Sequence, residues 1–167
     1  MEDRIAIALA EQQLHLIRAH DGHRQWPVST GAAGAGEQAG SGATPRGHHR
    51  IRAMIGAGAS VDAVFVGRRP TGEIYSPALA SRYPERDWIL TRILWLCGCE
   101  PGRNRGGDVD TQRRLIYIHG TPADEPMGVP RSHGCIRMRS ADIVALFAHC
   151  RPGMPVWIGE SAPCLDR

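Results

Sequence analysis

The sequence contains no lysine, and all 20 of its basic residues are arginines, set against 17 acidic residues for a formal net charge of +3. Without a side-chain primary amine the protein cannot form a Schiff base with a substrate or with pyridoxal phosphate, and it lacks the lysine of a phosphate-binding P-loop. Aromatic residues make up only 5% of the chain. Because aromatic residues are few and the arginines are interspersed with acids, nucleic acid is not expected as a partner.

Long apolar runs are also absent. The longest, from Ile93 to Cys99, is far shorter than the roughly 18 residues of a membrane-spanning helix, so no membrane span is expected. The start of the chain has neither the basic nor the apolar stretch of a secretory signal. Two locations therefore stay open: export by way of a leader that this chain does not carry, and a cytoplasmic role.

Glycine and proline, by contrast, are abundant, with 20 and 12 residues in a chain of 167. This length suits one domain with a hydrophobic core, and the many turn-forming residues favour short strands over long helices. A helix is predicted after Ser140, which is expected to be its N-cap. Alternating apolar residues predict strands on both sides of an Asp21-Gly22 turn and at 48–55, and the apolar runs at 89–96, 115–118 and 156–158 are interpreted as further strands.

The stretch from Ile116 to Met138 holds the residues most suited to catalysis. A predicted strand delivers His119 at its end, and Cys135 follows in the segment Ser-His-Gly-Cys. A cysteine nucleophile needs an imidazole that takes its proton and N–H donors aimed at the developing oxyanion. Cys135, His119 and the backbone N–H groups around Gly134 supply these three parts.

Two other interpretations stay open at this point. In the first, Cys135 is a small buried side chain and the nearby histidines are hydrogen-bonded structural residues. In the second, zinc is bound, although a C-x-C pair is tighter than the spacing typical of structural zinc and no second pair follows. The ligands would come from Cys97, Cys99, His119, His133 and Cys135.

The cysteine count itself is odd. With five cysteines, at least one thiol lies outside any internal disulfide. The cysteines outside the Ser-His-Gly-Cys segment are expected to be packing thiols: Cys97, Cys99, Cys150 and Cys164.

Two strings in the stretch of 116–138 are similar to a known signature. Ile-His-Gly-Thr at 118–121, followed by Ser-His-Gly-Cys-Ile-Arg-Met at 132–138, resembles the L,D-transpeptidase (YkuD-like) catalytic domain. Upstream, Val-Ser-Thr-Gly at 28–31 and Thr-Pro-Arg-Gly at 44–47 are similar to further elements of that family. The resemblance runs from about Ile5 to about Ile158, nearly the whole chain.

The resemblance implies a fold and a domain organisation. We expect a mainly β domain, a sandwich or barrel of mixed sheets, with a short helix after Cys135. Residues 1–160 would form this catalytic domain, and residues 161–167 would be a C-terminal tail.

It also implies an activity and its partners. Members of the family are cysteine acyltransferases of peptidoglycan, which cleave the bond between diaminopimelate and D-alanine in a stem peptide through a thioester. They pass the acyl group to an amine and so cross-link the cell wall. This reaction contributes to cell wall biogenesis and to cell shape. The expected partners are donor and acceptor stem peptides, with β-lactams, especially carbapenems, as covalent inhibitors. No cofactor is expected, and the implied location is the periplasm or cell wall.

Residue by residue, the resemblance makes Cys135 the nucleophile and His119 the general base and later the general acid. The backbone N–H groups of His133, Gly134 and Cys135 would form the oxyanion wall. The histidine also needs an orienting group, for which the carbonyl of Gly120 and the nearby acids are open candidates.

The remaining implied roles concern the surroundings of the thiol. Arg137 would shape the site or contact a carboxylate of the substrate, and Ser132 would form a hydrogen bond within its turn. Two alternative functions also remain: the same site with water as acceptor, an L,D-carboxypeptidase, and a non-catalytic peptidoglycan-binding module. A binding module has no need of both His119 and Cys135, which speaks against the module.

Overall fold

The computed structural model describes residues 2–163; Met1 and residues 164–167, which include Cys164 and the end of the predicted tail, lie outside the described residues. The elements in chain order are β1 (Arg4–Ala8), β2 (Gln13–Ile17), β3 (His23–Pro27), β4 (Gly47–Ile55), β5 (Ala63–Val66), β6 (Arg69–Ile74), α1 (Pro77–Arg82), β7 (Ile89–Gly98), a 3-10 turn (Gly107–Val109), β8 (Tyr117–Thr121), β9 (Ile136–Arg139), α2 (Ser140–Phe147) and β10 (Pro155–Gly159).

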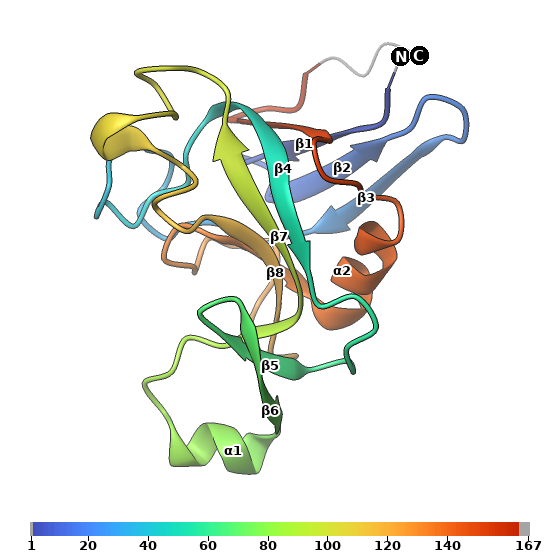
Figure 1. The fold of residues 1–167 in the computed structure, drawn as a ribbon, viewed down its shortest axis with the longest axis vertical. Helices are drawn as coiled ribbons and strands as arrows, with labels where there is room; N and C mark the ends of the chain where they lie inside the picture. The colour runs from blue at the N-terminus through green and yellow to red at the C-terminus, as the bar shows by residue number, and fades with distance from the viewer. Residues whose placement is uncertain (1, 164–167) are drawn as a thin grey trace.

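The strands join in one curled, mixed sheet of ten strands (Figure 1). Its order is β3-β2-β1-β10-β4-β7-β5-β6, and β8 adds to β7 and carries β9. Two pairs are parallel, β1 with β10 and β8 with β9, and the others are antiparallel. The prediction of a mainly β domain with mixed pairing is confirmed, although the strands belong to one continuous sheet.

Strand β7 runs through the middle of this sheet, and its alternating side chains separate two apolar clusters. Leu94 and Leu96 belong to the main core, which also takes in side chains of α2. Ile93 and Trp95 point the other way into a smaller cluster, against which Cys135 packs. Because successive side chains of a strand alternate between faces, the candidate nucleophile lies on the opposite face of β7 from the main core.

The helix predicted after Cys135 is present as α2, but its beginning differs from the prediction. Ser140 is the first helical residue rather than the N-cap, a position that Arg139 takes without a side-chain capping bond. The Ser140 hydroxyl instead donates to Asp62 Oδ1 at 2.8 Å and is hydrogen-bonded to Thr91 Oγ1 at 2.7 Å. The Ser140 hydroxyl, which capping preference assigns to the start of the helix, is therefore used in tertiary hydrogen bonds instead.

The strand before the catalytic segment is also shifted. It was expected to end at His119, yet β8 runs from Tyr117 to Thr121 and His119 lies at its centre. Leu115 has a φ of +57° and is 45% exposed, so it interrupts the extended backbone. Between β4 and β7, a stretch without clear periodicity forms the β5–β6 hairpin and α1, which project from the body of the sheet (Figure 1).

Membrane insertion through helices finds no support in the fold. No helix within residues 2–163 has the length and hydrophobicity that a membrane crossing requires.

Gly120 permits the close approach of β8 to β7. It pairs with Leu90 across the two strands, and a Cβ atom at position 120 would lie 2.6 Å from the carbonyl oxygen of Leu90. Since that neighbour is backbone in a buried sheet, it cannot move aside without distorting the strand pair. The glycine after the catalytic histidine is thus required sterically.

We expect Gly120→Ala to lower the free energy of unfolding by about 2–4 kcal/mol, because overpacking displaces buried backbone. Gly34→Ala is the matched control, since Gly34 has a φ of +84° with nothing within 4 Å of the added Cβ, and it should cost only about 1–2 kcal/mol of backbone strain. Urea denaturation of both variants measures the difference. Equal losses would contradict the steric role of Gly120.

Candidate active site

His119 is held in one tautomer by its neighbour in β8. The residue is 1% exposed, and its Nδ1 lies 2.7 Å from the carbonyl oxygen of Gly120. A carbonyl oxygen only accepts hydrogen bonds, so Nδ1 carries the proton and Nε2 presents a lone pair. Burial lowers the pKa of His119, which keeps the ring neutral. Of the candidate orienting groups, the Gly120 carbonyl is the one in contact.

Cys135 is held as a neutral thiol on the same side of β8. Its Sγ accepts from the backbone N–H of Tyr117 at 3.3 Å and donates to the carbonyl of Leu115 at 3.3 Å. Desolvation raises the pKa of the thiol to about 11, against a smaller lowering by the Tyr117 N–H. The hydrogen-bond partners of Sγ are thus backbone groups, one of them two residues before His119 in β8, and the resting pair is a neutral thiol and a neutral imidazole.

The loop that carries Cys135 is closed by Ser132. The Ser132 hydroxyl donates to the carbonyl of Cys135 and accepts from the Gly134 N–H at 3.2 Å. Ser132 therefore bonds within the turn. The Gly134 N–H, one of the three amides assigned to the oxyanion wall, is directed into the loop, which leaves the amides of His133 and Cys135 for that wall. Gly134 itself has a φ of +123°, and a Cβ there would lie 3.0 Å from the Ala43 carbonyl.

The Val-Ser-Thr-Gly segment at 28–31 fixes this loop from the N-terminal half of the chain. Ser29 and Arg137 exchange two backbone hydrogen bonds of 2.9 Å, and the Ser132 N–H donates to the Thr30 carbonyl at 2.9 Å. The Ser29 hydroxyl donates to the Val129 carbonyl at 2.7 Å and accepts from the Arg131 N–H at 3.0 Å. Residues 28–31 thus hold the stretch from 129 to 137 on both sides of Cys135.

The Thr-Pro-Arg-Gly element adds a single side-chain bridge. Thr44, which is fully buried, donates from Oγ1 to the carbonyl of Gly134 at 2.9 Å and accepts from the N–H of Gly31 at 2.9 Å. One hydroxyl therefore joins the loop at 31–43, the start of β4 and the residue next to the thiol.

Arg137 is 6% exposed and is already paired with acids of the protein. Its guanidinium donates to Asp87 at 3.1 Å and to Glu125 at 3.5 Å. Asp87 also lies 3.4 Å from Nδ1 of His133. Of the two roles that the resemblance implies, this geometry supports shaping of the site. The sequence pointed to Arg137 but not to Asp87, which lies in the stretch without periodicity.

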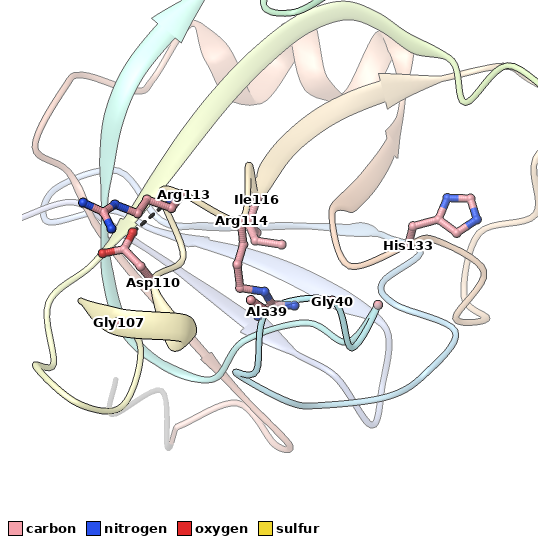
Figure 2. A pocket seen from close by; sticks show the side chains of 9 residues that line it. Ala39, Gly40, Gly107, Asp110, Arg113, Arg114, Ile116 and His133 are labelled. Atoms are coloured by element: carbon pink, nitrogen blue, oxygen red, sulfur yellow. Dashed lines mark hydrogen bonds between the residues drawn. The ribbon is translucent and has the colours of Figure 1, made fainter.

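Arg114 is a further residue at the site that no motif indicated. Its half-buried guanidinium donates to the carbonyls of Gly36 (3.2 Å), Glu37 (3.1 Å) and Ala43 (2.6 Å). These bonds gather the glycine-rich loop beside a cavity of about 500 Å³ that Arg114 lines together with His133. Figure 2 shows Arg114 extending from beneath Ile116 toward this loop. The positive charge lies close enough to Cys135 to lower the pKa of the thiol, against the larger effect of burial.

A metal centre does not form at these residues. Within residues 2–163 no three side chains of histidine, cysteine, aspartate or glutamate come together as metal ligands. Cys97 and Cys99 instead lie in a separate cavity with arginines.

The fold and site define the class of the molecule: a curled mixed sheet with a tautomerically fixed histidine in β8 and a cysteine directly before β9, the parallel neighbour of β8. The family model of the L,D-transpeptidase catalytic domain (YkuD) matches residues 2–158. The chain belongs to this family of peptidoglycan transpeptidase domains.

Solved structures give the same fold. An L,D-transpeptidase from Mycobacterium smegmatis superposes with a TM-score of 0.60 at 16% identity, over 95% of this chain and 58% of that one. An L,D-transpeptidase from Xylanimonas cellulosilytica gives 0.53 at 19%, over 95% and 60%. L,D-transpeptidase 3 from Mycobacterium tuberculosis, in complex with a faropenem-derived adduct, gives 0.55 at 15%, over 95% and 60%. The chain spans about three fifths of these proteins, and no curated protein matches it.

Removal of the Thr44 hydroxyl should loosen the catalytic loop. In Thr44→Val the N–H of Gly31 and the carbonyl of Gly134 lose a buried partner, and the free energy of unfolding should fall by about 2–4 kcal/mol. Thr44→Ser keeps the hydroxyl and should lose about 1 kcal/mol for one buried methyl group. Urea denaturation compares the two, and a valine variant as stable as the serine variant would exclude the bridge.

The neutral resting pair predicts the pH dependence of thiol alkylation. Only the thiolate reacts, and a thiol with a pKa of about 11 is almost wholly protonated at pH 7. The iodoacetamide rate at Cys135, followed by peptide mass mapping, should therefore rise about tenfold per pH unit from pH 7 to pH 10. A rate that is already level near pH 7 would indicate a thiolate–imidazolium pair instead.

Proposed function

We propose that the protein is a cysteine acyltransferase that acts on peptidoglycan stem peptides and cleaves the bond between diaminopimelate and D-alanine. The observation that carries the proposal is the tautomer of His119. Its Nδ1–H is bound to the Gly120 carbonyl, so the free lone pair of Nε2 is the one available to accept the thiol proton. The buried His49 has a similar Nδ1 bond to the Gly47 carbonyl, but its Nε2 is hydrogen-bonded to Thr111. Nε2 of His119, by contrast, has no hydrogen-bond partner within residues 2–163.

In the acylation step, the proton of Cys135 Sγ passes to Nε2 of His119, and Sγ attacks the carbonyl carbon of diaminopimelate. A C–S bond forms, and the carbonyl oxygen becomes an oxyanion that the backbone N–H groups of His133 and Cys135 stabilise. The imidazolium then gives its proton to the nitrogen of D-alanine as the C–N bond breaks. Free D-alanine leaves, and the acyl group remains on sulfur as a thioester.

The surroundings favour this sequence over a permanently charged pair. Burial opposes the charged forms of both His119 and Cys135, so charge develops when the substrate carbonyl is attacked. The guanidinium of Arg114, close to Cys135, then offsets part of the negative charge on sulfur, whereas the effect of Arg137 is exceeded by that of its partner Asp87. Such fixed charges need no reorganisation during the reaction.

Deacylation reverses the roles of His119. An amine from the diaminopimelate of a second stem attacks the thioester carbonyl and gives a proton to Nε2. The amide forms as the C–S bond breaks, the imidazolium returns the proton to Sγ, and the two stems are cross-linked. With water as the acceptor the same steps release a tripeptide, and the protein would be an L,D-carboxypeptidase.

The location follows from the substrate. Cross-linked peptidoglycan lies outside the cytoplasmic membrane, so we place the protein in the periplasm or cell wall, where it would act in cell wall biogenesis and the maintenance of cell shape. Action on soluble muropeptides inside the cell is the alternative.

A carbapenem tests the nucleophile directly. Its strained lactam carbonyl is an acyl donor, and the M. tuberculosis relative carries a faropenem-derived adduct. Intact-mass measurement should show one adduct on the folded protein, none on Cys135→Ala, and acylation at least 100-fold slower in His119→Gln, the range of a lost general base. An unmodified wild-type protein after long incubation would contradict the proposal. With purified tetrapeptide muropeptides, cross-linked dimers indicate transfer and tripeptides alone indicate hydrolysis.

A further inference from the structure

A second cavity, of about 400 Å³, lies beside the end of β7, away from the catalytic pair. The exposed face of β4, the end of β7 and the loop that follows it enclose this space. Its lining consists of Arg50, Arg52, Cys97, Gly98, Cys99, Arg105, Asp110 and Gln112. We call it the arginine pocket.

Strand periodicity brings the cations of the arginine pocket together. In β4, His49 and Ile51 are buried while Arg50 and Arg52 face outward. Arg50 is paired with Cys97 of β7. Arg105 comes from the loop after β7, whose backbone is fastened by the bond from Asn104 N–H to the Glu100 carbonyl at 3.0 Å. Three guanidinium groups from two elements thus share one opening.

These three arginines have no acidic partner. Among residues 2–163 no carboxylate lies within ion-pair distance of Arg50, Arg52 or Arg105, and Arg50 donates instead to the carbonyl of Gly153 at 2.8 Å. The one acid in the lining, Asp110, accepts from the N–H groups of Gly106 (2.8 Å) and Arg113 (2.9 Å). Its charge is thereby directed into its own turn, and the pocket presents an excess of positive charge.

The two cysteines that line the pocket do not oppose the binding of an anion. Cys97 and Cys99 are half-buried free thiols, and burial raises the pKa of Cys99, which keeps that thiol neutral. A guanidinium group offers two parallel N–H donors that match the two oxygens of a carboxylate. Three such groups in one lining favour a carboxylate over a cation as the occupant.

The arginine pocket adjoins the cavity that lies beside the glycine-rich loop. Asp110 is shared with the cavity that Arg114 and His133 line, and Figure 2 shows Asp110 at one end of that cavity and His133 at the other. Trp95 precedes Cys97 by two residues in β7, so both face the same way, and Trp95 belongs to the cluster against which Cys135 packs. A chain bound along this face can reach both places.

We propose that the arginine pocket binds a free carboxylate group of a peptidoglycan stem peptide while another part of that peptide lies at Cys135. The inference rests on the proposed function and adds a specificity to it: stems with free carboxylates are preferred over stems whose carboxylates are amidated. Neither the motif at 132–138 nor the catalytic pair requires this property.

The test measures binding in full-length Cys135→Ala protein, where no acyl transfer takes place. The probes are a fluorescently labelled stem tetrapeptide with free carboxylates and the same peptide with its branch carboxylates converted to carboxamides. Fluorescence anisotropy should show at least tenfold tighter binding of the free acid. Arg52→Gln/Arg105→Gln should remove that preference by weakening the free acid only. The matched control is Arg24→Gln/Arg82→Gln, two arginines of β3 and α1 that line none of the cavities described here, and it should leave the preference intact.

Three results would overturn the inference: equal affinity for the two probes, equal loss in the control, and displacement of both probes alike by inorganic phosphate, which would assign the pocket to a phosphate instead. The outcome is separate from that of the proposed function. A carbapenem adduct together with equal affinity for the probes would remove the pocket and keep the enzyme. A preference for the free acid without an adduct would keep the pocket and remove the transferase.

Discussion

The pairing of Ser29 with Arg137 is the contact on which the rest of the site depends. Two backbone hydrogen bonds join segments 108 residues apart in sequence, and the bonds of Thr30 and Thr44 to the catalytic loop follow from that pairing. Without this pairing, the loop before β9 would not be held at a fixed distance from β8. Cys135 would then lose its place beside the N–H of Tyr117. The candidate nucleophile is thus positioned by long-range backbone contacts rather than by its own neighbours in sequence.

Burial sets the chemistry of the pair that this contact positions. It raises the pKa of Cys135 and lowers that of His119, so each shift favours the neutral form and the two are mutually consistent. The hydrogen bond from Nδ1 to the Gly120 carbonyl fixes a tautomer without adding a charge. A carboxylate in that place would have favoured imidazolium. Position 120 therefore contributes twice: the missing side chain of glycine permits the strand packing, and its backbone carbonyl fixes the tautomer of His119.

Much of the fold could be predicted from the sequence where a local pattern matches its surroundings. The strand at 48–55 alternates in burial through its first half, the apolar segment at 89–96 is largely buried, and the Asp21-Gly22 turn joins β2 to β3. The stretch from 56 to 86 could not be assigned, because β6 and α1 there are largely exposed and show no burial period, and the buried β5 is only four residues long. Ser140 illustrates a different kind of error. Serine is a sound choice for a helix N-cap, but its hydroxyl here bonds to tertiary partners instead.

The site likewise contains residues that the sequence indicated and residues that it did not. The motifs at 118–121 and 132–138 pointed to Cys135 and His119, because these two short segments contain the candidate reactive side chains together with the glycines next to them. Arg114 and Asp87 act on that segment from elsewhere in the chain, so no spacing in sequence indicates them. Each makes contacts that only the folded chain brings together, and neither belongs to a motif.

The absence of lysine also has a structural side. Arg114 binds three carbonyls at once, Arg46 meets both oxygens of Glu37, and Arg86 does the same with Glu73. A single ammonium group cannot reproduce these planar arrangements. A guanidinium is moreover a poor nucleophile because it stays protonated. In the proposed mechanism an acyl-enzyme at Cys135 would have the cation of Arg114 close by, and the protein has no side-chain primary amine that would compete with the acceptor for the acyl group.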